Sequence, residues 1–240
     1  MVTDRIKAQF HIFVYCLTKH SVIIMRILSK NEEIANTWTH AAGILLGVVI
    51  GTIFIVMNVR GGDAWSGWSV GLYLSGMLCS YIASTVYHAL PSGSKSKAHL
   101  RKWDHAAIYW HIAGSYSPIT LMALRDSGLW GIGMFIFIWG AAIVGSIASF
   151  AHLKEHSYLE TCCYVLMGLS VVAAFGPLWN AAGPIATSWI IAEGVMYITG
   201  AIFYSIYKKP YMHTVFHSFV LLGSVCHIVA VWELLIKYIA

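Results

Sequence analysis

The stretch from residue 39 to residue 59, THAAGILLGVVIGTIFIVMNV, has no charged side chain and is long enough for a helix that crosses a bilayer. The rest of the chain has the same character. Hydrophobic residues make up 58% of its 240 residues, charged residues make up 10%, and the mean hydropathy is +0.70. Soluble proteins carry about 25% charged residues. The composition therefore indicates an integral membrane protein and excludes a disordered chain, a disulfide-stapled secreted domain and a nucleic-acid-binding protein.

Seven apolar stretches are each about 20 residues long, the length that the hydrocarbon core of a bilayer requires. They are continuous rather than alternating, which predicts helices and not a β-barrel. The connections between them are short and rich in Gly, Pro, Ser and Asn, so neighbouring helices are expected to pack antiparallel in one bundle. The predicted spans are 39–59, 66–88, 104–124, 129–150, 158–178, 185–206 and 213–235.

Lys and Arg are unevenly distributed between the two sides of these spans. Twelve of the 15 precede the first span or follow the second, fourth and sixth spans. The other three are Arg60, Arg125 and Lys237. Because cytoplasmic loops carry the excess of Lys and Arg, the bias predicts a cytoplasmic N-terminus and an outside C-terminus.

The chain divides into residues 1–30 and a seven-helix domain over 31–240. The apolar run from Phe10 to Met25 is interrupted by Lys19 and His20, which makes it a poor span. We interpret residues 1–30 as a helix lying at the inner interface. The alternative is an upstream extension, because Met25 can also start a chain.

Glycines recur every four residues in the first two spans. Gly43, Gly47 and Gly51 share one face of the first span, and Gly67 and Gly71 share a face of the second. Such stripes favour close helix packing inside the bundle. The alternative is a homodimer formed through the same stripe.

Four ionisable residues fall at one predicted depth, near the cytoplasmic face. His88 ends the second span, Asp104 begins the third, and His213 and His217 begin the seventh. His213 and His217 are four residues apart, so both imidazoles leave one face of a helix. Two such histidines with a third from another helix are typical of a zinc site whose fourth position is open to water.

Two further side chains have more than one interpretation. Ser84 lies one turn before His88, where its hydroxyl can face the metal site or bond its own helix. Asp104 can act as a general base, orient a histidine, or cap the third helix.

His227 is about 15 Å along the helix from His217, too far to share its metal. We favour a hydrogen-bonded partnership of His227 with Glu193 or a hydroxyl over a proton-relay role.

The combined pattern resembles the haemolysin III proteins, the bacterial branch of the progestin and adipoQ receptor superfamily. Ser84-x3-His88, Asp104 and His213-x3-His217 with His227 carry the resemblance. The N-terminal signature Glu33-x2-Asn36-x3-His40 and the stretch Gly114-Ser115-Tyr116-x-Pro118 also match it. The resemblance covers about residues 31–236.

The resemblance implies seven helices with an inside N-terminus and a zinc ion near the cytoplasmic face. It implies His88, His213 and His217 as ligands, with Asp104 and Ser84 around the zinc water. Relatives among the adiponectin receptors and alkaline ceramidases suggest hydrolysis of a membrane-lipid amide, and bacterial members suggest a role in membrane-lipid or membrane-energy homeostasis. The expected location is the bacterial inner membrane.

Three functions remain open from the sequence. In the first, the protein is a zinc-dependent hydrolase that takes a lipid sideways from the bilayer. In the second, it is a non-enzymatic sensor whose zinc is structural, with Asp104 as a fourth ligand. The third is a haemolytic pore or a transporter, which we rank last because the outer half has few polar side chains beyond Glu193 and His227.

Overall fold

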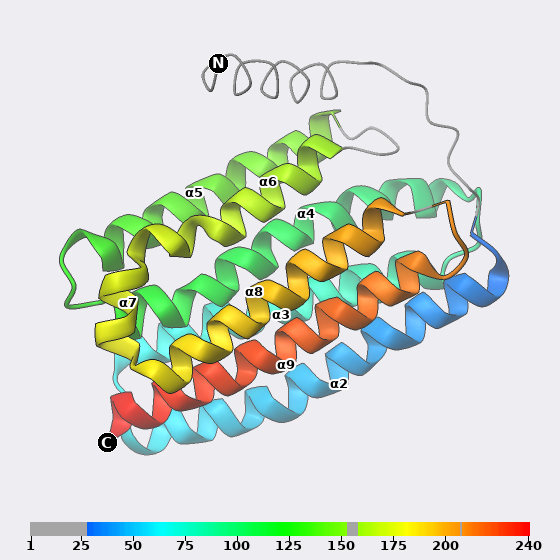
Figure 1. Ribbon diagram of the computed structural model, residues 1–240. Helices are drawn as coiled ribbons and strands as arrows, with labels where there is room; N and C mark the ends of the chain where they lie inside the picture. The colour runs from blue at the N-terminus through cyan, green and yellow to red at the C-terminus, as the bar shows by residue number, and fades with distance from the viewer. Residues whose placement is uncertain (1–27, 153–157, 207) are drawn as a thin grey trace, which may run out of the picture.

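A computed structural model of the protein describes residues 28–152, 158–206 and 208–240, and within these ranges the chain is helical and contains no strand (Figure 1). Each predicted span coincides with a helix or with a run of helical segments. The helices are α2 (Lys30–Gly61), α3 (Ala64–Ala89), α4 (Lys95–Pro118), α5 (Leu129–His152), α6 (Tyr158–Leu169), α7 (Phe175–Ala182), α8 (Pro184–Ser205) and α9 (Met212–Ile239), with a π-helical segment η1 (Ile119–Ala123) and a 3-10 segment η2 (Ser170–Ala174).

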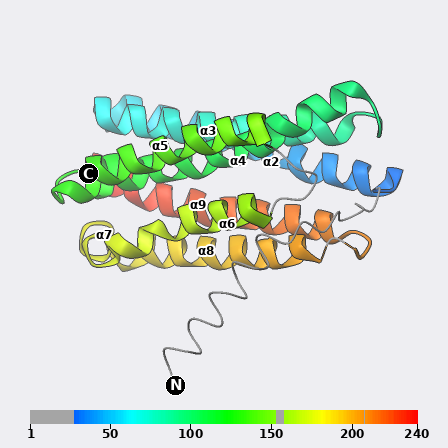
Figure 2. The ribbon, with the colours of Figure 1, turned by 90° about the horizontal axis from the view of Figure 1, so that it is seen from above.

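The long helices run side by side as one bundle, as both views show (Figures 1 and 2). α3 packs against α2 and α4, α4 packs against α5, and α9 packs against α8 and α2. The C-terminus lies at one end of the bundle, and the N-terminal ends of α2, α4 and α9 lie at the other (Figure 1). α3 runs the opposite way, so its C-terminal end lies with the N-terminal ends of α2, α4 and α9.

Two helices begin earlier than their apolar stretches because polar caps start them. Ser29 accepts a hydrogen bond from the backbone N–H of Glu32, and the Glu32 carboxylate accepts one from the N–H of Ser29. This capping box starts α2 at Lys30. Ser94 caps α4 in the same position, accepting from the N–H of Lys97. The interpretation of Asp104 as a helix cap is therefore wrong, because Asp104 lies in the third turn of α4.

The predicted fifth span is not one regular helix. α6 passes through η2 into α7, which bends away from α6 (Figure 1). Tyr116 of α4 holds this irregular backbone: its hydroxyl accepts a hydrogen bond from the N–H of Val171 at 2.8 Å and donates to the carbonyl of Gly168 at 2.7 Å. A tertiary contact thus replaces the backbone bonds that an apolar helix loses in this region.

Six helical stretches of the described chain are long and apolar enough to cross a membrane, one fewer than predicted. α4 is the exception because basic residues and histidines lower its hydropathy. In both views it nevertheless runs beside the other long helices (Figures 1 and 2). The apolar helices expose large side chains, among them Leu129 (89%) and Val59 (80%), as a lipid-facing surface does.

The glycine stripe of α2 packs inside the chain. A Cβ atom at Gly43 would lie 2.4 Å from the ring of Tyr81, and one at Gly47 would lie 2.8 Å from Leu78. Both neighbours belong to α3, so the prediction of close helix packing is confirmed for α2 and this stripe is not available to a second copy. No atom lies within 4 Å of the Cβ position of Gly71, so the prediction of close helix packing is wrong at this residue.

The interpretation of residues 1–30 as an interfacial helix concerns a segment of which the structure describes only residues 28–30.

Candidate metal centre

Three histidines converge at the end of the bundle where α3 ends and α9 begins. His88 lies in the last turn of α3, and His213 and His217 lie in the first two turns of α9. One ring nitrogen from each falls within 4.8 Å of the others. His88 and His217 are each 2% exposed, and His213 is half-buried. The structure therefore brings together the three side chains that the spacing selected.

The outer nitrogens of two of these rings are already engaged. Nδ1 of His88 lies 2.7 Å from Oε2 of Glu33, and Nδ1 of His217 lies 3.4 Å from the carbonyl oxygen of Asn36. A carboxylate or a carbonyl can only accept, so each contact assigns the ring proton to Nδ1 and leaves a lone pair on Nε2. This is how metal-binding histidines are usually held.

The spacing of the inner nitrogens fits a tetrahedral metal ion. Nε2 of His88 and Nε2 of His213 are 3.3 Å apart. Two nitrogens at about 2.0–2.1 Å from zinc, separated by a tetrahedral angle, would lie about 3.3–3.4 Å apart. With the proton of His88 on Nδ1, its Nε2 offers a lone pair toward His213. The three residues fit a zinc ion in number and type, and His88 and His213 also fit it in spacing.

A lysine that lies between the second and third predicted spans supports His88. Nζ of Lys97 lies 2.9 Å from Oε1 of Glu33, and it also donates to the carbonyl oxygens of Tyr87 at 3.0 Å and Leu90 at 3.2 Å. Lys97 therefore joins α4 to α2 and to the end of α3. Its signal in the sequence was the cap residue Ser94 three positions earlier, which places Lys97 inside a helix.

Asn36 and His40 of the N-terminal signature lie behind the cluster. Oδ1 of Asn36 accepts a hydrogen bond from Oγ1 of Thr214 at 2.6 Å, which fixes α2 against the first turn of α9. The ring of His40 stacks on that of His217 with centroids 3.6 Å apart. The signature residues Glu33, Asn36 and His40 therefore contact the three-histidine cluster directly or through one neighbour.

Asp104 and Ser84 lie near the cluster but do not bond to it in the described chain. Asp104 is half-buried and interacts electrostatically with the hydroxyl of Tyr87, the residue before His88. Ser84 is 3% exposed and lies one turn from His88 on α3. No hydrogen bond from Ser84 to a carbonyl of its own helix is formed among the described residues.

His227 lies apart from the metal cluster, as its spacing predicts. Its Nδ1 is 2.7 Å from Oε2 of Glu193 on α8, and both side chains are buried. The expected partnership of His227 with Glu193 is confirmed by this contact.

Comparison with known proteins agrees with the family resemblance. The sequence profile of the family described as Haemolysin-III related matches residues 28–228. The hemolysin-3 homolog of Bacillus subtilis is 35% identical over 80% of this chain and 89% of its own length, and the hemolysin-3 of Bacillus cereus is 34% identical over 80% and 87%. The heptahelical transmembrane protein ADIPOR2 of Oryza sativa is 30% identical over 73% and 85%. The chain belongs to the haemolysin-III-related family of multi-pass membrane proteins.

Proposed function

We propose that the protein is a zinc-dependent hydrolase that acts on the amide bond of a membrane lipid. One observation carries the proposal: three imidazole nitrogens lie within 4.8 Å of one another at a buried end of the bundle. Three protein ligands would leave a fourth position for a reactant, as in catalytic rather than structural zinc sites. His88, His213 and His217 would hold the ion.

When bound, zinc would polarise a carbonyl oxygen and make water a stronger nucleophile near neutral pH. The protein side chains would supply the proton transfers of hydrolysis. Asp104 takes the proton of the attacking water and returns it to the leaving nitrogen as the C–N bond breaks. The hydroxyl of Ser84 orients the reactants from the neighbouring turn of α3. The products are a carboxylic acid and an amine.

A lipid substrate suits a site surrounded by apolar helices. The acyl chains would stay against the exposed apolar faces of the bundle while the polar amide reaches the histidines. The resemblance to the adiponectin receptors and alkaline ceramidases favours an amide over an ester, and a role in membrane-lipid or membrane-energy homeostasis would follow from such an activity.

We further propose seven spans, with the N-terminus and the three-histidine cluster on the cytoplasmic side of a bacterial inner membrane. The bias of Lys and Arg supports this orientation. The position of α4 beside the other long helices supports a seventh span, as does the heptahelical description of the rice relative. Cysteine introduced at Lys95 should react with a membrane-impermeant maleimide only in inside-out vesicles, and cysteine at Ala240 only in right-side-out vesicles.

The metal is tested first. Mass spectrometry of detergent-purified protein should find about one zinc per chain in the wild type, and none in His88→Ala or His213→Ala. His99→Ala, which alters a histidine of α4 outside the cluster, should retain the metal. Retention of zinc in both cluster variants would contradict the ligand assignment.

The reaction is tested next, with a fluorescent ceramide-like amide and the zinc-loaded protein. Turnover that is lost in Asp104→Ala supports the hydrolase. Zinc without turnover above that variant would favour the second candidate, a sensor in which zinc is structural. That candidate has support of its own, because the cluster and its neighbours Glu33 and Lys97 already join α2, α3, α4 and α9.

A further inference from the structure

A series of buried polar side chains runs through the bundle beyond the metal centre. The hydroxyl of Tyr81 on α3 lies 2.7 Å from Oγ of Ser224 on α9. That oxygen is also 3.3 Å from the hydroxyl of Tyr197 on α8 and 3.5 Å from Nε2 of His111 on α4. Four helices thus direct polar groups to one point of an otherwise apolar interior. These contacts play no part in holding the three histidines.

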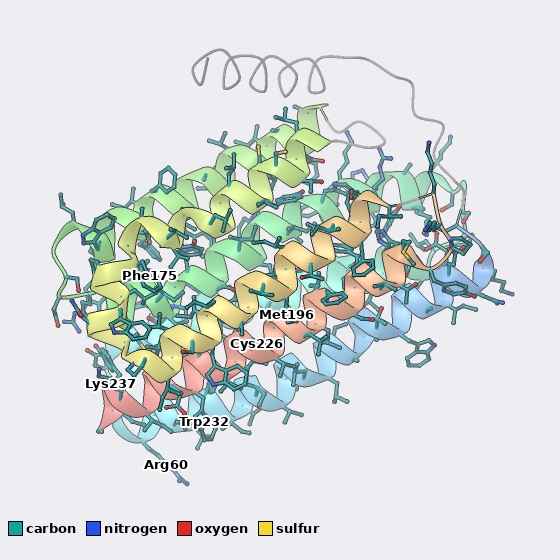
Figure 3. The ribbon with its side chains drawn as sticks, viewed as in Figure 1. Arg60, Phe175, Met196, Cys226, Trp232 and Lys237 are labelled. Atoms are coloured by element: carbon teal, nitrogen blue, oxygen red, sulfur yellow. The ribbon has the colours of Figure 1, made fainter. Side chains whose placement is uncertain are left out.

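This series connects the metal centre to the Glu193–His227 pair. At one end, the ring of His40 stacks on His217 and makes an edge contact with Tyr81 at 5.1 Å between centroids. At the other end, the ring of Tyr73 lies 5.0 Å from that of His227. Cys226, the neighbour of His227, lies near the middle of the bundle in Figure 3, as does Met196 of α8. The polar series therefore extends about halfway along the helices. We call it the polar column.

Several atoms of the polar column are buried without any hydrogen-bond partner among the described residues. They are both ring nitrogens of His40, the hydroxyl of Tyr73 and Nε2 of His227. Burying such groups unpaired is costly, and folded proteins usually satisfy them with internal water. Unpaired atoms at both ends of the column, with hydroxyls between them, indicate water along its length.

The polar column ends against an apolar layer. Phe54, Val231 and Leu235 are fully buried, and Val70 is 2% exposed. The ring of Phe54 lies 6.4 Å from that of Tyr73 and 6.3 Å from that of Trp232. These side chains separate Tyr73 and His227 from the end of the bundle that carries the C-terminus. A pore through the bundle would have to cross this layer, so the column has access from one end.

We propose that the polar column holds a file of water molecules that carries protons between the three-histidine end and the Glu193–His227 pair. The pair is then a proton-binding site in the middle of the membrane, accessible from one side. The proton enters on Nε2 of His227, because Nδ1 already faces Glu193. Neutral imidazole beside a carboxylate has a net charge of −1, and proton uptake makes the pair neutral, which a low-dielectric interior favours. This role requires neither zinc nor hydrolysis.

Other titratable groups that face this pair come from the helices packed around it. His111 interacts electrostatically with His227, and Tyr73 contacts its ring. The groups that interact with Glu193 are Tyr73 on α3, Tyr116 on α4, Tyr197 on α8 and Cys226 on α9. Among these groups only His111 is a second imidazole that could exchange a proton with His227, so its substitution by Asn belongs among the controls.

The water is tested on the wild-type protein, as purified, by hydroxyl-radical footprinting with radicals generated from water by X-rays. Tyr73 and Tyr81 are 1% and 0% exposed, yet bound water beside them should make them react. Phe54, an equally buried aromatic residue outside the column, should not react. Protection of both tyrosines to the level of Phe54 would overturn the proposal.

Proton binding is tested with the full chain in detergent, by a jump from pH 8 to pH 6 followed with an indicator dye. The Glu193→Gln variant should take up about one proton fewer per chain than the wild type. The His111→Asn variant should still bind a proton at the Glu193–His227 pair. Tyr81→Phe keeps the ring and should slow uptake about tenfold, the effect of one lost hydrogen bond on a barrier. Equal uptake by the wild type and Glu193→Gln would overturn the proposal, whatever the zinc and hydrolysis assays give.

Discussion

Replacing Glu33 by Gln tests whether this residue of the N-terminal signature strengthens metal binding by His88. The carboxylate of Glu33 lies 2.7 Å from Nδ1 of His88, while its other oxygen binds Lys97. Gln keeps an acceptor of the same size and removes the charge. The variant should therefore leave His88 in place and make it a weaker ligand.

The size of the effect follows from the kind of hydrogen bond. Bonds to charged groups contribute about 1.5–3 kcal/mol, roughly twice as much as neutral ones. Removing the charge should therefore cost about 1–1.5 kcal/mol of metal-binding free energy. Because 1.36 kcal/mol corresponds to a factor of about ten, zinc should bind about 5- to 13-fold more weakly. Glu33→Leu, which removes the acceptor, should fall in the range of about 10–100-fold that lost outer partners produce.

The assay is competition for zinc between the purified protein and a fluorescent chelator, at one fixed pH because protons compete for the same nitrogens. The matched control is Glu160→Gln. Glu160 contacts Nδ1 of His105 at 3.1 Å, a similar pair on α6 and α4 away from the cluster. Zinc affinity within twofold of the wild type in Glu33→Gln, or an equal loss in Glu160→Gln, would refute the reasoning.

Three other changes probe the fold around the site. Lys97→Met leaves Glu33 and two carbonyl oxygens without their buried ammonium partner, and should lower the free energy of unfolding by about 3 kcal/mol, measured as a drop in the thermal midpoint in detergent. Gly76→Ala places a Cβ atom 2.4 Å from the carbonyl oxygen of Trp110, which is backbone and cannot turn aside, so the yield of folded protein should fall sharply, whereas Gly71→Ala on the same helix should behave as the wild type. The backbone N–H of Ser66 and then the side chains of Tyr238 and Arg125 lower the pKa of Asp63, so the stabilisation by its carboxylate is present above about pH 4 and is lost as the pH falls through the lowered pKa. Asp63→Asn should therefore lower the free energy of unfolding by less than about 1 kcal/mol at pH 7 and by less still at pH 3. An equal loss at both pH values would contradict this assignment.

The helices were predictable from apolar runs, but two of their starts were not. An apolar run shows where a helix can contact lipid, whereas a helix begins where a side chain caps its free N–H groups. The signal was present for α2, because Ser29 and Glu32 form the pattern of a capping box. Reading Ser94 as a cap would likewise have placed Lys97 and Asp104 inside α4 rather than at its edge.

His88, His213 and His217 were predictable because the limits of the predicted spans place all three at the same depth in the membrane. Their partners were harder to find. Glu33 stands out only through the family signature, and Lys97 lies outside the predicted spans, among the charges of a predicted loop. A salt bridge between residues from different helices has no periodicity in the sequence. The contact between His227 and Glu193 was among the expected alternatives, since each is a buried polar group that needs a partner.

The failure of α4 to qualify as a span has a physical explanation that links the fold to the site. Hydropathy measures how well a helix tolerates lipid, but residues 113–122 are all buried in protein. The polar side chains that lower the hydropathy of α4 bond to other helices: Lys97 to α2 and α3, Lys102 to the carbonyl of Phe150 on α5, and His105 to Glu160 on α6. A helix that contacts other helices on these sides needs less lipid-compatible surface, and can carry the polar groups that a membrane enzyme or a proton path requires. The same residues that lower the hydropathy of α4 thus hold it against α2, α3, α5 and α6.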